Sequence, residues 1–177
     1  TANFAMAHLR ISNIAMLTAD NAARVRDSID EADVIELFTG AKMTGNGINF
    51  AQNGRIVLSS IEPNTAGVNG ASTGQWIRWQ RCDGARVFNS AYGGQGTGQN
   101  NASLQYVGPS TSPISAASGT AVMVVEVSYI YQPIIPNSFL SGREIRYESA
   151  FNVRQRTNQQ LNNAGNVTPR NCNVYNA

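Results

Sequence analysis

Charged side chains are scarce in this sequence. They make up only 14% of the 177 residues, whereas about a quarter is usual for soluble proteins. The formal net charge is +2 and the basic residues are scattered along the chain, which argues against nucleic acid as a main partner. Asn, Gln, Ser, Thr and Gly take the place of charged residues, a composition common on exported proteins and assembly subunits.

Metal-binding and nucleophilic residues are also few. One His and two Cys residues cannot complete a zinc site. His8 lies in a helical pattern without the neighbours of a catalytic triad, so we interpret it as a surface residue. Cys82 and Cys172 leave two alternatives, a disulfide or two free thiols. In an oxidising compartment we expect the disulfide, which would close a loop of about 90 residues and contribute roughly 4 kcal/mol.

Long hydrophobic runs are absent too. The longest lies within 121–135 and is interrupted by Glu126, so no stretch of the sequence is predicted to span a membrane. No signal peptide is visible. The chain begins at Thr1 inside a helical pattern and without Met, so we expect a preceding segment. Its length and its 42% apolar content predict one domain, 1–177, with a substantial core.

Helical periodicity marks residues 1–45. Residues 1–26 contain no Gly or Pro and carry apolar side chains at helical spacing, namely Phe4, Leu9, Ile11, Ile14, Leu17, Ala22 and Val25. Ser28 and Glu31 match the Ser-x-x-Glu pattern of a capping box, which predicts the start of a second helix that stops near Gly45. One long helix with a kink at 27–30 is the alternative.

Residues 50–157 alternate with period two and predict an antiparallel sheet with long loops. The expected strands cover 55–61, 75–82, 121–131 and 144–156, with 86–89 and 104–107 as candidates for two short additional strands. The third strand is apolar on most of both faces, which favours a central position, while the fourth has one polar face and suits an edge. Helices first and consecutive strands afterwards are typical of an α+β fold.

Three details of the sheet region are also predicted. Asn53 and Gly54 are expected to form a turn in which Gly tolerates positive φ. Trp76 and Trp79 are expected on opposite faces of their strand. Loops are expected at 91–103 and 109–119, and 158–177 is interpreted as a polar tail.

The remaining candidates for chemistry have simpler explanations. Gly93, Gly94, Gly96 and Gly98 lack the Lys-Ser/Thr of a phosphate-binding loop and a following helix, which favours a surface loop. Glu126, Glu144 and Glu148 lie on strands and could supply a glycosidase pair. Pairing of Glu126 with an Arg of the neighbouring strand is the favoured interpretation. We therefore expect a protein that is not an enzyme and that has no cofactor or metal.

Several segments together resemble a known family. They are TADNAARVRDSIDEADV near the N-terminus, Asn53 to Ile61, the WQRC sequence that ends at Cys82, the strand VEVSYIYQPII and the segment Phe151 to Arg154. In this combination the chain resembles the periplasmic part of TadE-like minor pseudopilins of the bacterial tight-adherence (Tad) pilus, over roughly 10–157.

The resemblance implies a pilin-like fold, in which an N-terminal amphipathic helix packs on an antiparallel sheet. It also implies an upstream membrane-spanning helix with a prepilin-peptidase cleavage region, neither of which is in this sequence. The implied location is the inner membrane with the domain in the periplasm, and later the pilus. The implied partners are other pilin and pseudopilin subunits and the inner-membrane assembly machinery.

The implied role is structural, in initiating or tipping a type IV-like pilus that mediates surface attachment. The alternative is an adhesin module that binds glycan or another surface ligand through its exposed loops, with Trp76 or Tyr92 as a stacking platform.

Overall fold

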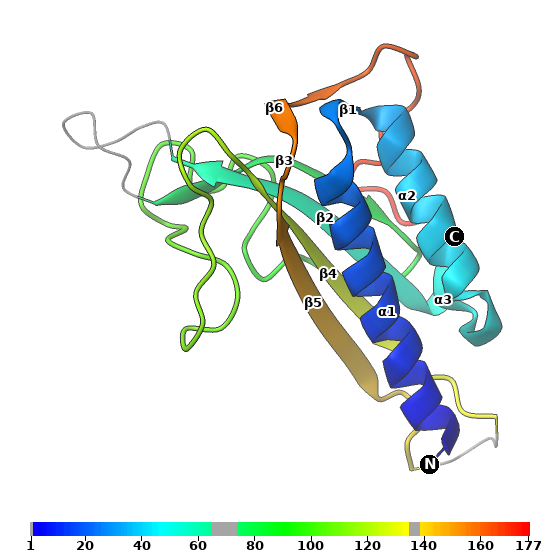
Figure 1. Ribbon diagram of the computed structural model, residues 1–177. Helices are drawn as coiled ribbons and strands as arrows, with labels where there is room; N and C mark the ends of the chain where they lie inside the picture. The colour runs from blue at the N-terminus through cyan, green and yellow to red at the C-terminus, as the bar shows by residue number, and fades with distance from the viewer. Residues whose placement is uncertain (1, 65–73, 135–138) are drawn as a thin grey trace.

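The computed structural model describes residues 2–64, 74–134 and 139–177 and contains helices and an antiparallel sheet (Figure 1). This agrees with the expected α+β class. The connection 63–74, between the first two expected strands, falls largely outside the described residues. The element bounds, in chain order, are α1 Ala2–Arg24, β1 Asp27–Asp30, α2 Glu31–Thr44, the short 3-10 helix η1 Asn46–Ile48, α3 Phe50–Asn53, β2 Gly54–Pro63, β3 Gln75–Asp83, β4 Val122–Ile130, β5 Glu144–Asn152 and β6 Arg156–Asn162.

The first predicted helix is confirmed as α1, but the start of the second was placed too early. Residue Asp30, not Ser28, is the N-cap of α2: its side chain accepts a hydrogen bond from the backbone N–H of Ala32, and the Asp33 side chain accepts one from the backbone N–H of Asp30. Ser28 lies instead in the extended segment β1, which interrupts the helical region. A capping box therefore does start α2, but Asp30 and Asp33 form it, two residues after the predicted Ser28 and Glu31.

The four predicted main strands are present as β2 to β5, in the spatial order β3-β2-β4-β5 with antiparallel neighbours. As expected, β4 lies inside the sheet and β5 lies at an edge with alternating exposure. The odd-numbered residues of β4 face the helices and the even-numbered ones face the loops, as shown by the two apolar clusters that they join. Strand alternation therefore predicted both faces of β4 correctly.

The segment expected as a polar tail begins with a strand. The strand β6 covers part of it and pairs in parallel with β1, with Ile29 opposite Leu161. Ile29 is fully buried. Two short segments that are far apart in sequence thus form a second, two-stranded sheet, and neither has a strand pattern of its own because both are polar and very short.

Three smaller predictions for the sheet were wrong. Gly54 has φ −121°, so it is an extended residue after α3 and not a positive-φ turn residue. Trp76 and Trp79 lie on the same face of β3, not on opposite faces. A register shift places Trp76 opposite Glu62 and Trp79 opposite Ser60. Glu62 and Ser60 are two residues apart on β2 and share a face, so the Trp residues paired with them do so as well. Residues 86–89 and 104–107 form no strand, and Val107 makes one isolated bridge to Ile114.

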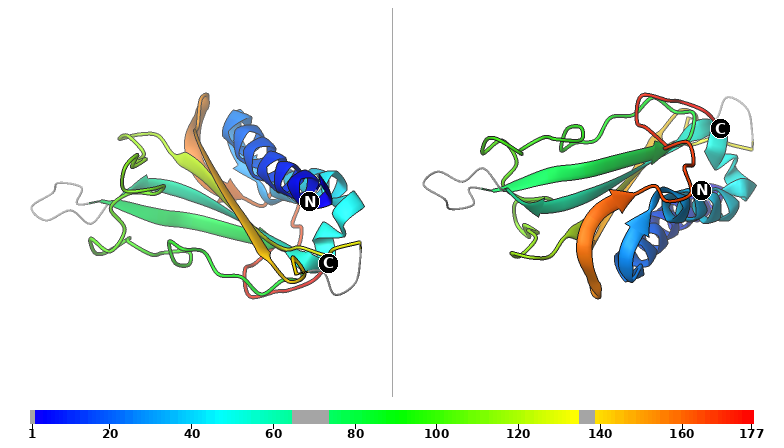
Figure 2. Two further views of the ribbon diagram at one scale, coloured as in Figure 1. Left: turned by 90° about the horizontal axis from the view of Figure 1, so that it is seen from below. Right: turned by 90° about the horizontal axis from the view of Figure 1, so that it is seen from above.

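The sheet has a different cover on each side. In Figure 1, α1 and α2 lie to the right of the sheet, and much of the connection 84–121 lies to its left. Figure 2 shows α1 beside the β4–β5 half of the sheet, and those are the strands that it contacts. The helix side encloses the larger apolar cluster, which includes Phe38, Phe50 and Tyr129, and the loop side encloses a smaller one around Ile61 and Ile77.

Candidate functional site

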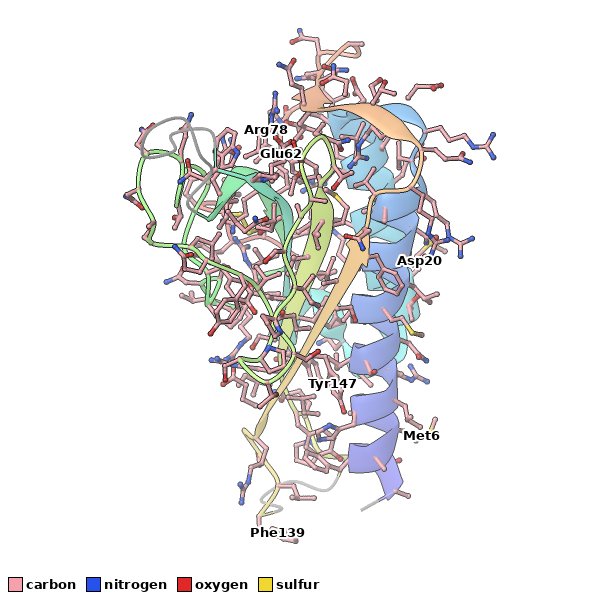
Figure 3. The ribbon with its side chains drawn as sticks, turned by 60° about the vertical axis from the view of Figure 1, so that its left-hand side comes forward. Met6, Asp20, Glu62, Arg78, Phe139 and Tyr147 are labelled. Carbon is pink, nitrogen blue, oxygen red and sulfur yellow. A yellow bond between two sulfur atoms is a disulfide. The ribbon has the colours of Figure 1, made fainter. Side chains whose placement is uncertain are left out.

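The helix α1 has two apolar sides. The side toward the sheet consists mainly of small or β-branched residues that are buried, namely Ala7, Ile11, Ile14, Ala15, Thr18, Ala19, Ala22 and Ala23. On other sides of the helix, Met6, Leu9, Met16 and Leu17 are 52%, 59%, 46% and 48% exposed. Figure 3 shows Tyr147 on the sheet side of α1 and Met6 on the other side. A row of large apolar side chains left exposed on a helix marks a candidate surface for contact with a partner.

The exposed residues of α1 follow a regular spacing. Ala2, Met6, Leu9, Asn13 and Met16 alternate in steps of four and three, and all five are exposed. Such a spacing places side chains in one stripe along a helix and is the pattern of helices that pack side by side. We call these five residues the outer stripe. A second helix could lie along it with its own apolar residues between those of α1.

A groove lies between α1 and α2. It has a volume of about 400 Å³ and is lined by Ile14, Leu17 and Thr18 on α1 and by Leu37 and Gly40 on α2, among others. A Cβ atom at Gly40 would meet no atom within 4 Å, so the wall of α2 is open there. The groove lining is mixed: Leu17 and Leu37 are apolar, whereas Asp33 and Glu36 are ionisable.

The two strand carboxylates with the most notable environment lie on the loop side of the sheet. Register places Glu126 directly opposite Glu148, whereas Arg146 lies opposite Ser128. The predicted cross-strand pair of Glu126 with an Arg is therefore wrong. Arg146 lies two residues before Glu148 on β5, so the register brings Glu148 and not Arg146 opposite Glu126. Arg146 forms its ion pair with Glu144, at 2.7 Å.

Glu126 is the more buried of these carboxylates, with 5% of its surface exposed. Its Oε1 accepts a hydrogen bond of 2.8 Å from the backbone N–H of Ala91, and its Oε2 has no hydrogen-bond partner. Burial raises the pKa of Glu126 and the neighbouring Glu148 raises it further, while the hydrogen bonds from Ser90 and Ala91 oppose the shift.

Tyr92 completes this group. Its hydroxyl donates to the Glu148 carboxylate at 2.8 Å and accepts from the backbone N–H of Gly108 at 2.7 Å. Burial and the bond to Glu148 raise the pKa of the Tyr92 hydroxyl. The group therefore fastens two loop segments to the sheet. These hydrogen bonds give Tyr92 a structural role, which argues against its use as a stacking platform for a glycan.

The two cysteines meet at the far edge of the sheet. Cys82 and Cys172 form a disulfide across 90 residues of sequence. Next to it, Arg55 is fully buried and donates hydrogen bonds to the carbonyl oxygens of Gly84, Cys172 and Val174, while its guanidinium lies over the Tyr175 ring. Sequence reasoning missed Arg55, since nothing in its strand pattern distinguishes a buried arginine.

The other residues that were considered for chemistry have structural roles. His8, expected at the surface, is half-buried, and its Nδ1 lies 3.2 Å from the Tyr147 hydroxyl. Trp79 is buried and donates its Nε1–H to the carbonyl oxygen of Gln159. Within the described residues, no three His, Cys, Asp or Glu side chains are grouped to hold a metal ion.

Comparison with known proteins found no similar protein. No family model, curated protein or solved structure matches this chain. Among the described helices, none combines the length and the apolar content needed to cross a membrane. Among the surfaces of the described chain, the outer stripe of α1 is the most distinctive.

Proposed function

We propose that this chain is a non-enzymatic, structural subunit, the periplasmic domain of a TadE-like minor pseudopilin that helps to initiate or tip a Tad-type pilus. The observation that carries the proposal is the outer stripe of α1. A soluble, isolated domain has no use for Met6, Leu9 and Met16 in one exposed line, whereas a subunit whose N-terminal helix packs against other helices requires such a line.

The arrangement of α1 on the sheet supports the same role. Its sheet side is rich in alanine, so the helix lies close to β4 and β5 and is held along most of its length. A helix held in this way presents its outer stripe at a constant orientation. We propose that the helix continues upstream into a membrane-spanning segment, which would anchor the domain in the inner membrane before its incorporation among other pilin subunits.

The test is a charge substitution in the outer stripe. The double variant Leu9→Glu and Met16→Glu in the full-length protein places two carboxylates in the helix–helix contact, where burial of unpaired charge is strongly unfavourable. We expect piliation to fall to the level of a strain that lacks the gene. Crosslinks from a photoreactive residue at Met6 to other pilins should be lost at the same time.

The matched control is Val87→Glu, because Val87 is 72% exposed and lies outside α1. It should leave piliation unchanged. Normal piliation with the double variant, at wild-type amounts of folded protein, would overturn the assembly role. Normal piliation combined with failed surface attachment after substitutions in 91–103 would favour the adhesin alternative.

A further inference from the structure

The N-terminal end of α1 lies beside residues 131–134, which follow β4. Figure 1 shows the start of α1 and these residues at the same end of the molecule. One cavity of about 490 Å³ joins them, with Met6 and Arg10 of α1 lining it together with Ile134 and the segment 46–49. We call the surface made by Met6, Arg10, Ile134, Phe139 and Arg143 the basal end.

Large apolar side chains protrude at the basal end. Ile134 is 76% exposed and Phe139 is 80% exposed, the highest exposed fractions among the large apolar residues described. Figure 3 shows Phe139 at the extremity of the molecule, near the first turn of α1, with Met6 farther along the same helix. Exposed aromatic and aliphatic side chains gathered at one extremity indicate a binding surface.

The basal end also lacks negative charge. The three segments that form it, 1–19, 45–55 and 127–143, contain no Asp or Glu in the sequence, although the chain has 11 such residues. Neither Arg10 nor Arg143 lies within ion-pair distance of a carboxylate in the part of the chain that the structure describes. Glu144, next in sequence to Arg143, is already paired with Arg86 and Arg146.

From these observations we infer that the basal end binds the surface of an anionic lipid bilayer. Phe139 and Ile134 enter the headgroup region, and Arg10 and Arg143 lie at the level of the lipid phosphates. Apolar side chains beside unpaired basic ones are the features that hold peripheral proteins at such an interface. Contact between protein chains through Phe139 is the competing explanation, and the experiment distinguishes the two by the oligomeric state of the wild type.

This inference goes beyond the proposed assembly role and does not depend on it. It assigns a reversible membrane contact to the folded domain itself, made by Ile134, Phe139 and the two arginines. Together with the proposed upstream anchor, this contact would fix the orientation of α1 relative to the bilayer. The chain alone is sufficient to test the lipid contact, so its failure would leave the filament test unaffected, and the reverse also holds.

The experiment measures co-sedimentation of the 177-residue chain with large unilamellar vesicles. One set consists of phosphatidylcholine alone and the other contains a third of phosphatidylglycerol. We expect binding to the anionic vesicles, weaker binding to the neutral ones and a decrease as salt is raised, because exposed charges are screened. Phe139→Ser should reduce the partition coefficient roughly tenfold, and Arg143→Glu at least about fivefold.

Two matched variants separate the basal end from general attraction. Arg26→Glu makes the same charge change at the other end of α1, and Val87→Ser makes a comparable change at another exposed apolar residue. Both should bind as the wild type does. Circular dichroism and the intact disulfide verify folding of every variant.

Three results would overturn the inference. The first is absence of binding to the anionic vesicles at low salt. The second is an equal loss with Arg26→Glu and Arg143→Glu, which would indicate nonspecific attraction of a chain with net charge +2. The third is a self-associated wild type that Phe139→Ser makes monomeric, which would assign the basal end to contact between protein chains.

Discussion

The two faces of the main sheet are covered in different ways. On one face, α1 and α2 enclose a continuous apolar cluster to which every odd-numbered residue of β4 from Met123 to Tyr129 contributes. On the other face, loops enclose a smaller apolar cluster, and sheet side chains bind the loop backbone. Gln80 donates to the carbonyl oxygen of Gly93, and Gln75 accepts from the backbone N–H of Ala116.

The difference follows from backbone hydrogen bonding. A helix satisfies its own N–H and C=O groups, so apolar side chains alone can attach it to a sheet. A loop has unpaired backbone groups, and those that become buried need partners from elsewhere. The buried polar residues Gln75, Gln80 and Glu126 supply such partners on the loop side. Substitutions on the two faces should therefore change the free energy of unfolding by different amounts and even in opposite directions.

The largest effect is expected on the helix side. Ile11 is fully buried in α1 against the sheet, so Ile11→Ala should lower the free energy of unfolding by about 2–5 kcal/mol through lost burial and a cavity. Met16→Ala, on the outer stripe of the same helix, should change it by less than about 0.5 kcal/mol. Urea unfolding measures both. Equal effects would show that α1 does not have the two distinct sides described above.

A gain in stability is expected on the loop side from Glu126→Gln. Burial raises the pKa of Glu126, so the folded state binds a proton more tightly than the unfolded state does. The wild type is therefore most stable below the ordinary pKa of 4.5 and loses stability as the pH rises through the raised value. The amide keeps an acceptor for Ala91 and adds a donor that can face Glu148.

We expect Glu126→Gln to raise the free energy of unfolding at pH 8 by roughly 1–3 kcal/mol, the penalty typical of a buried polar group without a partner. At pH 4 the variant and the wild type should be nearly equal. Glu36→Gln, at an exposed position of α2, is the control and should be neutral at both values. A loss of stability at pH 8 would contradict the assigned cost of Glu126.

A smaller and opposite pH effect is expected from Glu144, at the start of β5. Burial alone would raise its pKa, but hydrogen bonds from Arg146 and Ser128 and the charge of Arg86 outweigh burial and lower the pKa to about 2. This carboxylate therefore stabilises the fold above its ordinary pKa of 4.5, and the contribution is lost as the pH falls toward about 2.

Glu144→Gln should lower the free energy of unfolding at pH 7 by about 1 kcal/mol or less, since the pair is partly exposed and screened. Between pH 4.5 and pH 2 the variant should lose less stability than the wild type does. Thermal unfolding across that range measures the difference. Parallel curves for the two proteins would show that the Glu144 ion pairs contribute nothing to stability.

Part of the candidate site was predictable and part was not. The apolar residues of α1 could be predicted from their spacing. Which of them face the sheet could not, because α1 carries apolar residues on more than one side and periodicity alone cannot choose between two such sides. The helical spacing places Ile14 in one apolar stripe with either Leu17 or Thr18. In the structure Ile14 and Thr18 are buried on the sheet side, and Leu17 is half-exposed at the groove.

The sequence by itself determined the elements with strong local patterns: the helix α1, the four main strands, the central position of β4 and the separation of its two faces. Local periodicity is sufficient for these because each pattern extends over several residues. Only the tertiary structure decided the pairing of β1 with β6, the meeting of Glu126 with Glu148 and the burial of Arg55. Each depends on register or on contacts between distant segments, and a shift of one or two residues along a strand changes which side chains meet without changing the local pattern.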